Sequence, residues 1–193
     1  MKRILAALIA VGVIAIALYA SVLPSKNNLS LKSIKPELIL NQIKALKEQE
    51  SRTGDELFLT LNACVSGGVI EYKRIPAKPG HWLSRHIDEV KKISLWSQSL
   101  TEGQIATINI ELNDEDAEPF NPDDLLGVVQ VQLKNENGEL VVHWDIPHRT
   151  GMAAPNKLES DVPDTMTEEP DHVQKFDLNN DGAHYQVYLS VKE

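Results

Sequence analysis

The sequence has one cysteine and lacks the short motifs that mark several common enzyme classes. Because Cys64 has no second cysteine to pair with, an intrachain disulfide is excluded even in an oxidising compartment. Cys64 lies in a run of alternating residues, where we expect a small buried side chain rather than a nucleophile. The chain has no Gly-x-Ser-x-Gly motif, no His-Glu-x-x-His motif and no phosphate-binding glycine loop. These absences predict that the protein is not an enzyme.

Basic residues are also scarce, since 19 lysines and arginines face 28 aspartates and glutamates, for a formal net charge of −9. The first 23 residues hold two of the basic residues and none of the acids, so the remainder carries a charge of 17 − 28 = −11. A surface this negative repels nucleic acid, and nucleic-acid binding is therefore excluded. It is compatible with cations or basic proteins as partners.

One long uncharged segment stands at the start of the chain. Residues 4–23 contain no charge and follow the basic pair Lys2-Arg3. As a helix, 20 residues cover roughly 30 Å, the thickness of the bilayer core. A cleaved signal has a shorter apolar core of ~7–15 residues before small residues, whereas Leu18 stands where a small side chain is needed and no lipobox is present. The segment favours an uncleaved signal anchor in the inner (cell) membrane, with a cleaved signal as the alternative, and either places the bulk of the chain in the periplasm.

The next segment, 24–55, predicts a linker followed by one amphipathic helix at about 36–50. Pro36 suits a first helical turn, and Gly54 lies just past the end. Leu38, Ile39, Ile43 and Leu46 recur at helical spacing. We expect this apolar stripe to pack on the following domain, while contact with the membrane or with a second copy remains open.

From residue 56 onward the hydrophobic period changes to two, which is typical of strands. Asparagine and glycine in 135–138 and 180–182 favour hairpin turns between successive runs. Residues 147–171 have four prolines and six acids without periodicity, which indicates a long surface loop. We predict strands at 56–65, 69–75, 90–96, 105–113, 127–134, 139–146, 172–177 and 183–191. One core should contain Leu57, Leu59, Leu61, Ile108, Ile110, Val129, Val131, Tyr185, Val187 and Leu189.

Together these patterns predict a mainly β protein. The fold class is an antiparallel β-sandwich preceded by one amphipathic helix and an N-terminal transmembrane helix. The expected domains are the anchor (1–23), the linker with its helix (24–55) and the sandwich (56–193).

The strongest chemical signal is the loop at 113–124. Between Glu111 and Asp124 there are seven acids and no base. Crowded carboxylates repel one another unless water and ions screen them or a cation binds, and calcium takes six to eight oxygen ligands. A calcium site and a solvated polar loop are both consistent with this composition.

The order of residues in this loop resembles the C2 domain, the calcium- and phospholipid-binding β-sandwich. Asp-x-Asp ends one strand, and Asp-Asp-Leu-Leu-Gly opens the next. The resemblance covers about 56–193 and implies calcium as a cofactor. The positions that match the family's ligands are Asp114, Asp116 and Asp124, with Asp123 as an alternative ligand. The earlier loop that supplies further aspartates in that family corresponds to 65–73, which contains none.

Two weaker metal patterns have ordinary explanations. The run 177–182 begins like an EF-hand loop, but its twelfth position is Tyr188 rather than a glutamate, so a turn is expected. The histidines include the pair His81 and His86 and the neighbours His143 and His148, which lack the cysteines or the motif of a zinc site.

The sequence thus predicts a non-catalytic, membrane-anchored, extracytoplasmic binding module. Its partner is expected to be a protein or a component of the cell envelope. The alternative is a periplasmic immunity or inhibitor protein whose acidic loops, 111–124 or 159–171, block a basic cleft.

The anchor prediction is tested by the N-terminus of the mature protein. Because residues 4–23 lack a good cleavage site, we expect the full chain to stay in the membrane fraction after an alkaline wash. Mass spectrometry of the mature protein checks this. A mature N-terminus between residues 22 and 29 would show that the segment is a cleaved signal.

Overall fold

The fold is built from antiparallel strands. The computed structural model describes residues 32–50, 54–116, 123–146, 167–168, 172–180 and 182–193. In these ranges the one helix is the short 3-10 helix η1 (Ser84–Glu89). Accordingly, the described ranges contain no helix with the length and apolar character needed to cross a membrane. The predicted anchor at 4–23 lies outside the described residues.

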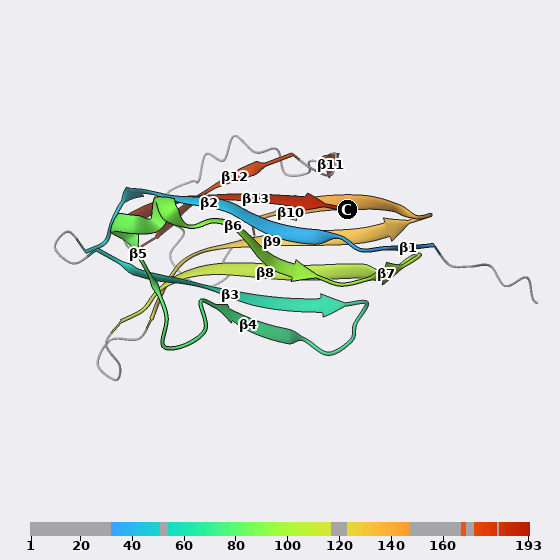
Figure 1. The fold of residues 1–193 in the computed structure, drawn as a ribbon, viewed down its shortest axis with the longest axis horizontal. Helices are drawn as coiled ribbons and strands as arrows, with labels where there is room; N and C mark the ends of the chain where they lie inside the picture. The colour runs from blue at the N-terminus through green and yellow to red at the C-terminus, as the bar shows by residue number, and fades with distance from the viewer. Residues whose placement is uncertain (1–31, 51–53, 117–122, 147–166, 169–171, 181) are drawn as a thin grey trace, which may run out of the picture. The chain divides into compact units, whose positions relative to one another are not determined.

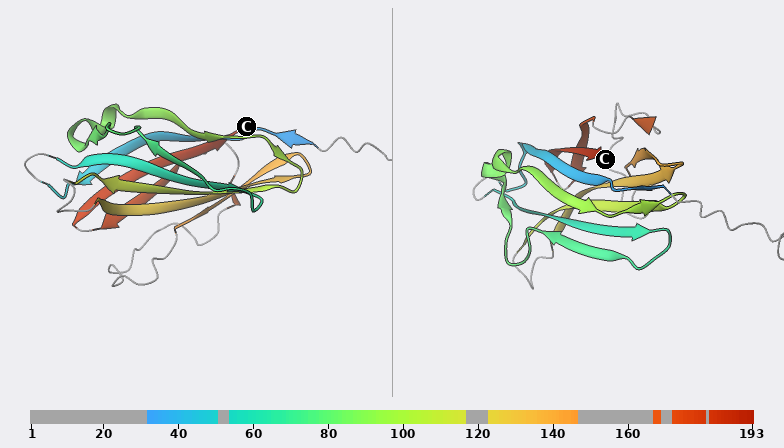
Figure 2. Two further views of the ribbon diagram at one scale, coloured as in Figure 1. Left: turned by 90° about the horizontal axis from the view of Figure 1, so that it is seen from below. Right: turned by 45° about the vertical axis from the view of Figure 1, so that its right-hand side comes forward.

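Two sheets form the layers of a β-sandwich (Figures 1 and 2). The larger sheet has the spatial order β11 (Thr167–Glu168), β10 (Glu139–Asp145), β9 (Asp124–Glu136), β8 (Ile105–Asp114), β3 (Glu56–Val65) and β4 (Glu71–Ile75), with β5 (Trp82–Leu83) also paired to β3. The smaller sheet has the order β12 (Gln174–Asn180), β13 (Ala183–Lys192), β2 (Glu37–Lys47) and β6 (Lys91–Ser97). A short pair, β1 (Ser33–Ile34) with β7 (Leu100–Thr101), completes the set.

The core lies between the two sheets, because each strand turns its alternate apolar residues inward. All ten residues that the alternation predicts for the core are buried. Contact between the layers includes Trp144 of β10 and Phe176 of β12, whose ring centroids are 5.2 Å apart. Gly127 of β9 permits a close approach, since a Cβ there would lie 2.8 Å from Leu178 of β12.

The predicted helix at 36–50 is wrong. Residues 37–47 form β2, which pairs with β13 on one side and with β6 on the other. The buried residues on β2 are Leu38, Leu40 and Ile43. Leu40 pairs with Leu189 and Gln42 with Tyr188, so Asn41 is an extra residue at a β-bulge. The bulge lengthens one interval between inward residues from two to three, and this spacing imitates a helical stripe.

The domain boundary at residue 56 changes for the same reason. Residues 32–193 form one compact unit, to which β1 and β2 belong. Residues 32–50 and 54–55 therefore belong to the same unit as the sandwich, and the part of the predicted linker at 24–31 lies outside the described residues.

The other strand predictions are confirmed with small shifts at their ends. The hairpin between β9 and β10 has Asn137 and Gly138 at φ 56° and 90°, as a two-residue turn of type I′ requires. Buried Asn135 supports this turn, because its side chain accepts from the Gly138 amide and donates to the carbonyl oxygens of Lys32 and Leu100. Of the predicted loop 147–171, the structure describes only β11.

The connections between strands gather at two ends of the sandwich (Figure 1). The register of β3 with β8 runs from Leu57 opposite Asp114 to Val65 opposite Ala106. These pairs are eight residues apart, or roughly 27 Å at ~3.4 Å per residue. We call the first the acidic end and the second the entry end, because the chain enters the sandwich there at Lys32.

The core assignment is tested by truncating Leu59, which is fully buried on β3. Leu59→Ala should lower the free energy of unfolding by ~2–5 kcal/mol, because it removes buried methyl groups and leaves a cavity. Leu46→Ala on β2 is the matched control, since Leu46 is 53% exposed, and it should change stability by less than ~0.5 kcal/mol. Chemical unfolding followed by tryptophan fluorescence measures both. Equal losses in the two variants would contradict the assignment of the strand faces.

Candidate functional site

The acidic end brings together two loops that are distant in the sequence. One joins β2 to β3, and the other joins β8 to β9. The side-chain amide of Gln49 donates to Asp124 Oδ2 at 3.0 Å and so connects them. The described acids of this end are Glu48, Glu50, Asp55, Glu56, Asp114, Glu115, Asp116, Asp123 and Asp124.

Asp55 holds the first loop in place. Its side chain is 1% exposed and accepts hydrogen bonds from the amides of Gln49 and Glu50 at 3.0 and 2.8 Å. The hydroxyl of Tyr185, on the opposite sheet, donates to the same carboxylate. Burial, followed by the hydrogen bond to Asp55, raises the pKa of Tyr185, so the phenol stays protonated and remains a donor.

Two hydrogen bonds between Asp55 and Ser84 extend this arrangement to η1. The amide of Asp55 donates to Ser84 Oγ at 2.9 Å, and the amide of Ser84 donates to the Asp55 carbonyl at 2.9 Å. Gly54 precedes them at φ +80°, and a Cβ on it would lie 2.7 Å from Ser84 Oγ. This turn therefore requires glycine both for its conformation and for space.

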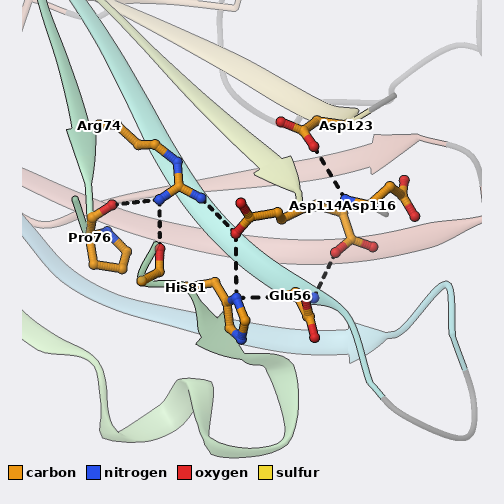
Figure 3. Close-up of polar contacts among 9 residues, drawn as sticks. Glu56, Arg74, Pro76, His81, Asp114, Asp116 and Asp123 are labelled. Atoms are coloured by element: carbon orange, nitrogen blue, oxygen red, sulfur yellow. Dashed lines mark hydrogen bonds and ion pairs between the residues drawn. The ribbon is translucent and has the colours of Figure 1, made fainter. Parts of the chain in front are cut away.

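Asp114 is the most buried of the predicted ligands. Its side chain, at 4% exposure, accepts from the Glu56 amide at 2.6 Å (Figure 3). Burial raises the pKa of Asp114 to about 7, against the lowering effect of that hydrogen bond, and the charges of Asp55, Asp116 and Glu50 add to the rise. Asp114 thus holds the first amide of β3 by a hydrogen bond and is only partly ionised near neutral pH.

The other three predicted ligands are more accessible. Asp124 lies opposite Asp114 in the register of β9 with β8. The amide of Asp116 donates to Asp123 Oδ1 at 3.2 Å across the loop, as the dashed line in Figure 3 shows. The structure therefore places all four predicted residues at one end of the sandwich, where their backbones approach one another.

A cationic network borders this loop on the β4 side (Figure 3). The Arg74 guanidinium donates to the carbonyl oxygens of Pro76 and Gly80 and to Glu115 Oε2 at 2.8 Å. It also covers the ring of Phe58, 4.0 Å from the centroid. His81 Nδ1 lies 3.4 Å from the same Glu115 oxygen. These bonds fix Glu115 and neutralise part of its charge.

Calcium requires several carboxylates that converge on one point. Among the described residues, no group of three or more histidine, cysteine, aspartate or glutamate side chains is placed to hold a metal ion. Asp114 faces a backbone amide, and Asp123 accepts one. The described residues, as arranged, do not fit a calcium ion, and calcium binding remains a prediction.

The minor candidates have structural roles. Asp177 lies within β12 and accepts from His184 and Gln186 at 2.9 Å each, so the EF-hand-like run is part of a hairpin, as expected. His86 contacts Glu89, away from the acids around His81. Half-buried Cys64 donates to the Gly68 carbonyl at 3.4 Å. His148 lies outside the described residues.

Sequence reasoning missed the residues that build the acidic end. The sequence does not identify Asp55 or Arg74 as site residues, and it predicts Tyr185 only as a core residue. An aspartate directly after a glycine at the start of a strand is the signal for Asp55, since aspartates bond to nearby amides in turns. Nothing local points to Arg74, because its partners come from three other parts of the chain.

The chain was compared with family models, curated sequences and solved structures. No family model matches the chain, and no curated protein sequence matches it significantly. Among solved structures, a C2 domain of plant extended synaptotagmin 1 is similar, with a TM-score of 0.34 and 11% identity over 82% of this chain and 93% of that chain. Human GIVD cytosolic phospholipase A2, in complex with methyl gamma-linolenyl fluorophosphonate, has a TM-score of 0.33 and 9% identity. That match covers 84% of this chain but only 18% of the phospholipase chain. Both TM-scores lie below 0.5, so these likenesses carry no conclusion about ligand or activity.

The raised pKa of Asp114 predicts an unusual dependence of stability on pH. An acid whose pKa rises on folding, here from 3.8 to about 7, binds its proton more tightly in the folded state. Its contribution to stability is therefore present below pH ~4 and is lost as the pH rises towards ~7. Asp114→Asn removes the titration and keeps an oxygen that accepts from the Glu56 amide. Relative to the natural protein, we expect this variant to gain about 2 kcal/mol more at pH 8 than at pH 5.

Chemical unfolding of both proteins at the two pH values, with chelator present, measures this difference. Asp124→Asn is the control, because its more exposed carboxylate shows no such burial. If the free energy of unfolding of Asp114→Asn depends on pH in the same way as that of the natural protein, the pKa of Asp114 is not raised by folding.

Proposed function

We propose that this protein is a non-catalytic binding module, held by residues 4–23 on the extracytoplasmic face of a membrane. The acidic end is its binding surface. The observation that supports this proposal is the position of the carboxylates. They gather at the end of the sandwich farthest from Lys32. Lys32 is the residue from which the chain leads back to the proposed anchor.

The partner that fits this surface best is a protein with a basic patch. Asp116, Asp123 and Asp124 all belong to the β8–β9 connection, and Gln49, Asp55 and Tyr185 hold the adjacent β2–β3 loop in place. Spread negative charge attracts a basic surface over a distance and speeds association, an effect that salt screens. An immunity or inhibitor protein that covers a basic cleft is one form of this function.

Calcium binding by a C2-like domain is the second candidate. Its support is the convergence of the backbones of Asp114 and Asp124 in register, together with the Asp116–Asp123 contact. A bound ion would need the carboxylates to turn toward one another, and the four predicted ligands would then hold it. Calcium would supply a positive charge that neutralises the loop and can bridge to an anionic partner.

Capture of partners from an envelope extract, with matched variants, tests both candidates. The first variant combines Asp116→Asn, Asp123→Asn and Asp124→Asn at the acidic end. The control combines Glu71→Gln, Glu102→Gln and Glu139→Gln, which removes the same charge near the entry end. Exposed charges contribute ~0.2–1 kcal/mol each, so the first variant should bind about tenfold more weakly and the control should bind normally.

The ionic conditions separate the two candidates. A basic partner should be released by salt and should be indifferent to chelator. Release by chelator, reversed by calcium but not by magnesium, would favour the calcium site instead. Equal binding by both variants would overturn the assignment of the acidic end.

A further inference from the structure

The tip of the β3–β4 hairpin carries adjacent apolar side chains in solvent. Val69 is 89% exposed, Ile70 is 65% exposed and Tyr72, on β4, is 66% exposed. Scattered exposed apolar residues are ordinary on a protein surface. Val69 and Ile70 are neighbours in the chain on this turn and Tyr72 follows on β4, so three large apolar side chains are exposed within four residues, which needs an explanation.

The turn that presents these residues is fixed to the sandwich. Ser66 and Gly67 have φ 45° and 74°, and the Gly68 amide donates to the Val65 carbonyl at 2.9 Å. The Ser66 amide donates to the Ile105 carbonyl at 2.7 Å, and its hydroxyl accepts from the Ile105 amide at 3.0 Å. The two apolar side chains therefore project from an ordered base.

This tip lies at the entry end, together with β7 and β1 (Figures 1 and 2). A series of hydrogen bonds connects the turns of this end to one another. Ser66 is bonded to Ile105, the Gln104 carbonyl accepts from the Asn135 amide, and the Asn135 side chain donates to the Lys32 carbonyl. The hairpin thus shares one end of the sandwich with the residue at which the chain enters it.

The sequence before Lys32 limits how far this end can lie from a membrane. Eight residues, 24–31, separate the apolar segment 4–23 from Lys32. Fully extended, they reach at most ~3.3–3.6 Å each, or under about 30 Å. If the segment spans a bilayer, the entry end stays within one domain length of the lipid surface.

Charge favours the same orientation. The charges near the entry end nearly cancel, with Lys32, Lys35, Lys73, Lys134 and Lys192 against Glu37, Glu71, Glu102, Glu136, Glu139 and Glu193, whereas the acidic end has a large excess of carboxylates. An anionic lipid surface repels the acidic end and is nearly neutral toward the entry end. Tyrosine is enriched at membrane interfaces, and valine and isoleucine gain free energy on leaving water.

We propose that the β3–β4 hairpin dips into the interface of the bilayer that holds the anchor, with Val69 and Ile70 among the lipid headgroups. This inference rests on the anchoring part of the proposed function. The hairpin is a second contact with the membrane, and it holds the sandwich upright so that the acidic end faces away from the lipid.

Depth-dependent fluorescence quenching on the full chain tests this proposal. In a Cys64→Ser background, Ile70→Cys or Glu89→Cys is labelled with an environment-sensitive dye. Both positions are exposed, and Glu89 ends η1 near the acidic end. The protein is reconstituted into phosphatidylethanolamine–phosphatidylglycerol vesicles with or without lipids that carry a spin-label quencher near the headgroup. In vesicles without quencher, we expect the emission of the dye at position 70 to shift to the blue. In vesicles with quencher, that dye should lose most of its emission. The dye at position 89 should change in neither sample.

Each other result overturns the inference in a recognisable way. Flotation of the vesicles on a density gradient shows whether the protein is anchored. If the protein floats with the vesicles but the dye at position 70 is not quenched, the anchor is supported and the hairpin contact is rejected. A dye at 70 that is shielded from aqueous iodide but not quenched by lipid means that a protein covers the patch. Quenching at both positions means that the sandwich lies flat. Protein that does not float at all rejects the anchor, and the hairpin contact with it.

Discussion

The carboxylate of Asp55 is the constraint on which the acidic end depends. It is buried between the two sheets, where an unpaired charge would be costly. The amides of Gln49 and Glu50 and the hydroxyl of Tyr185 surround it with donors. Because Tyr185 belongs to the smaller sheet and Asp55 leads into β3 of the larger one, this single group joins both layers at one end of the sandwich.

That arrangement explains how so many acids can share one end. Burial raises the pKa of Asp114, and the nearby charge of Asp55 raises it further. The inner acids are occupied with backbone and tyrosine donors and act as framework. The outer ones, Asp123 and Asp124, lie at the rim, where a basic partner or a cation can reach them. In the proposed function these outer carboxylates, which also hold Gln49 and the Asp116 amide, are the ones that meet the partner.

The two ends of the sandwich differ in chemistry, and the long strands between them keep the two ends apart. Along β3, roughly 27 Å separates the carboxylate end from the hairpin tip. At the entry end, buried Asn135 connects Lys32, β7 and the β9–β10 turn through its side-chain amide. The sandwich therefore has exposed apolar residues near the point of chain entry and an acidic surface at its other end. The proposed function assigns the membrane to the first and a partner to the second.

The sequence alone predicted the sandwich, its core and the acidic loop, because each of these depends on local order. Alternating residues on β3, β8, β9 and β13 identify the buried face, and Asn137-Gly138 identifies a hairpin. It misassigned β2, since the bulge at Asn41 exists only through pairing with β13 and changes the spacing of inward residues.

Only the tertiary structure decided which loops meet and what each acid does there. Asp55, Tyr185 and Arg74 draw their partners from segments far apart in the chain, so no local pattern reveals them. The same holds for Asp114. The composition of its loop predicts a metal ligand, but in the structure Asp114 is buried and accepts the first amide of β3. Local order determines strands and turns through backbone geometry, whereas ionisation and contact depend on desolvation and proximity, which exist only after the two sheets have packed.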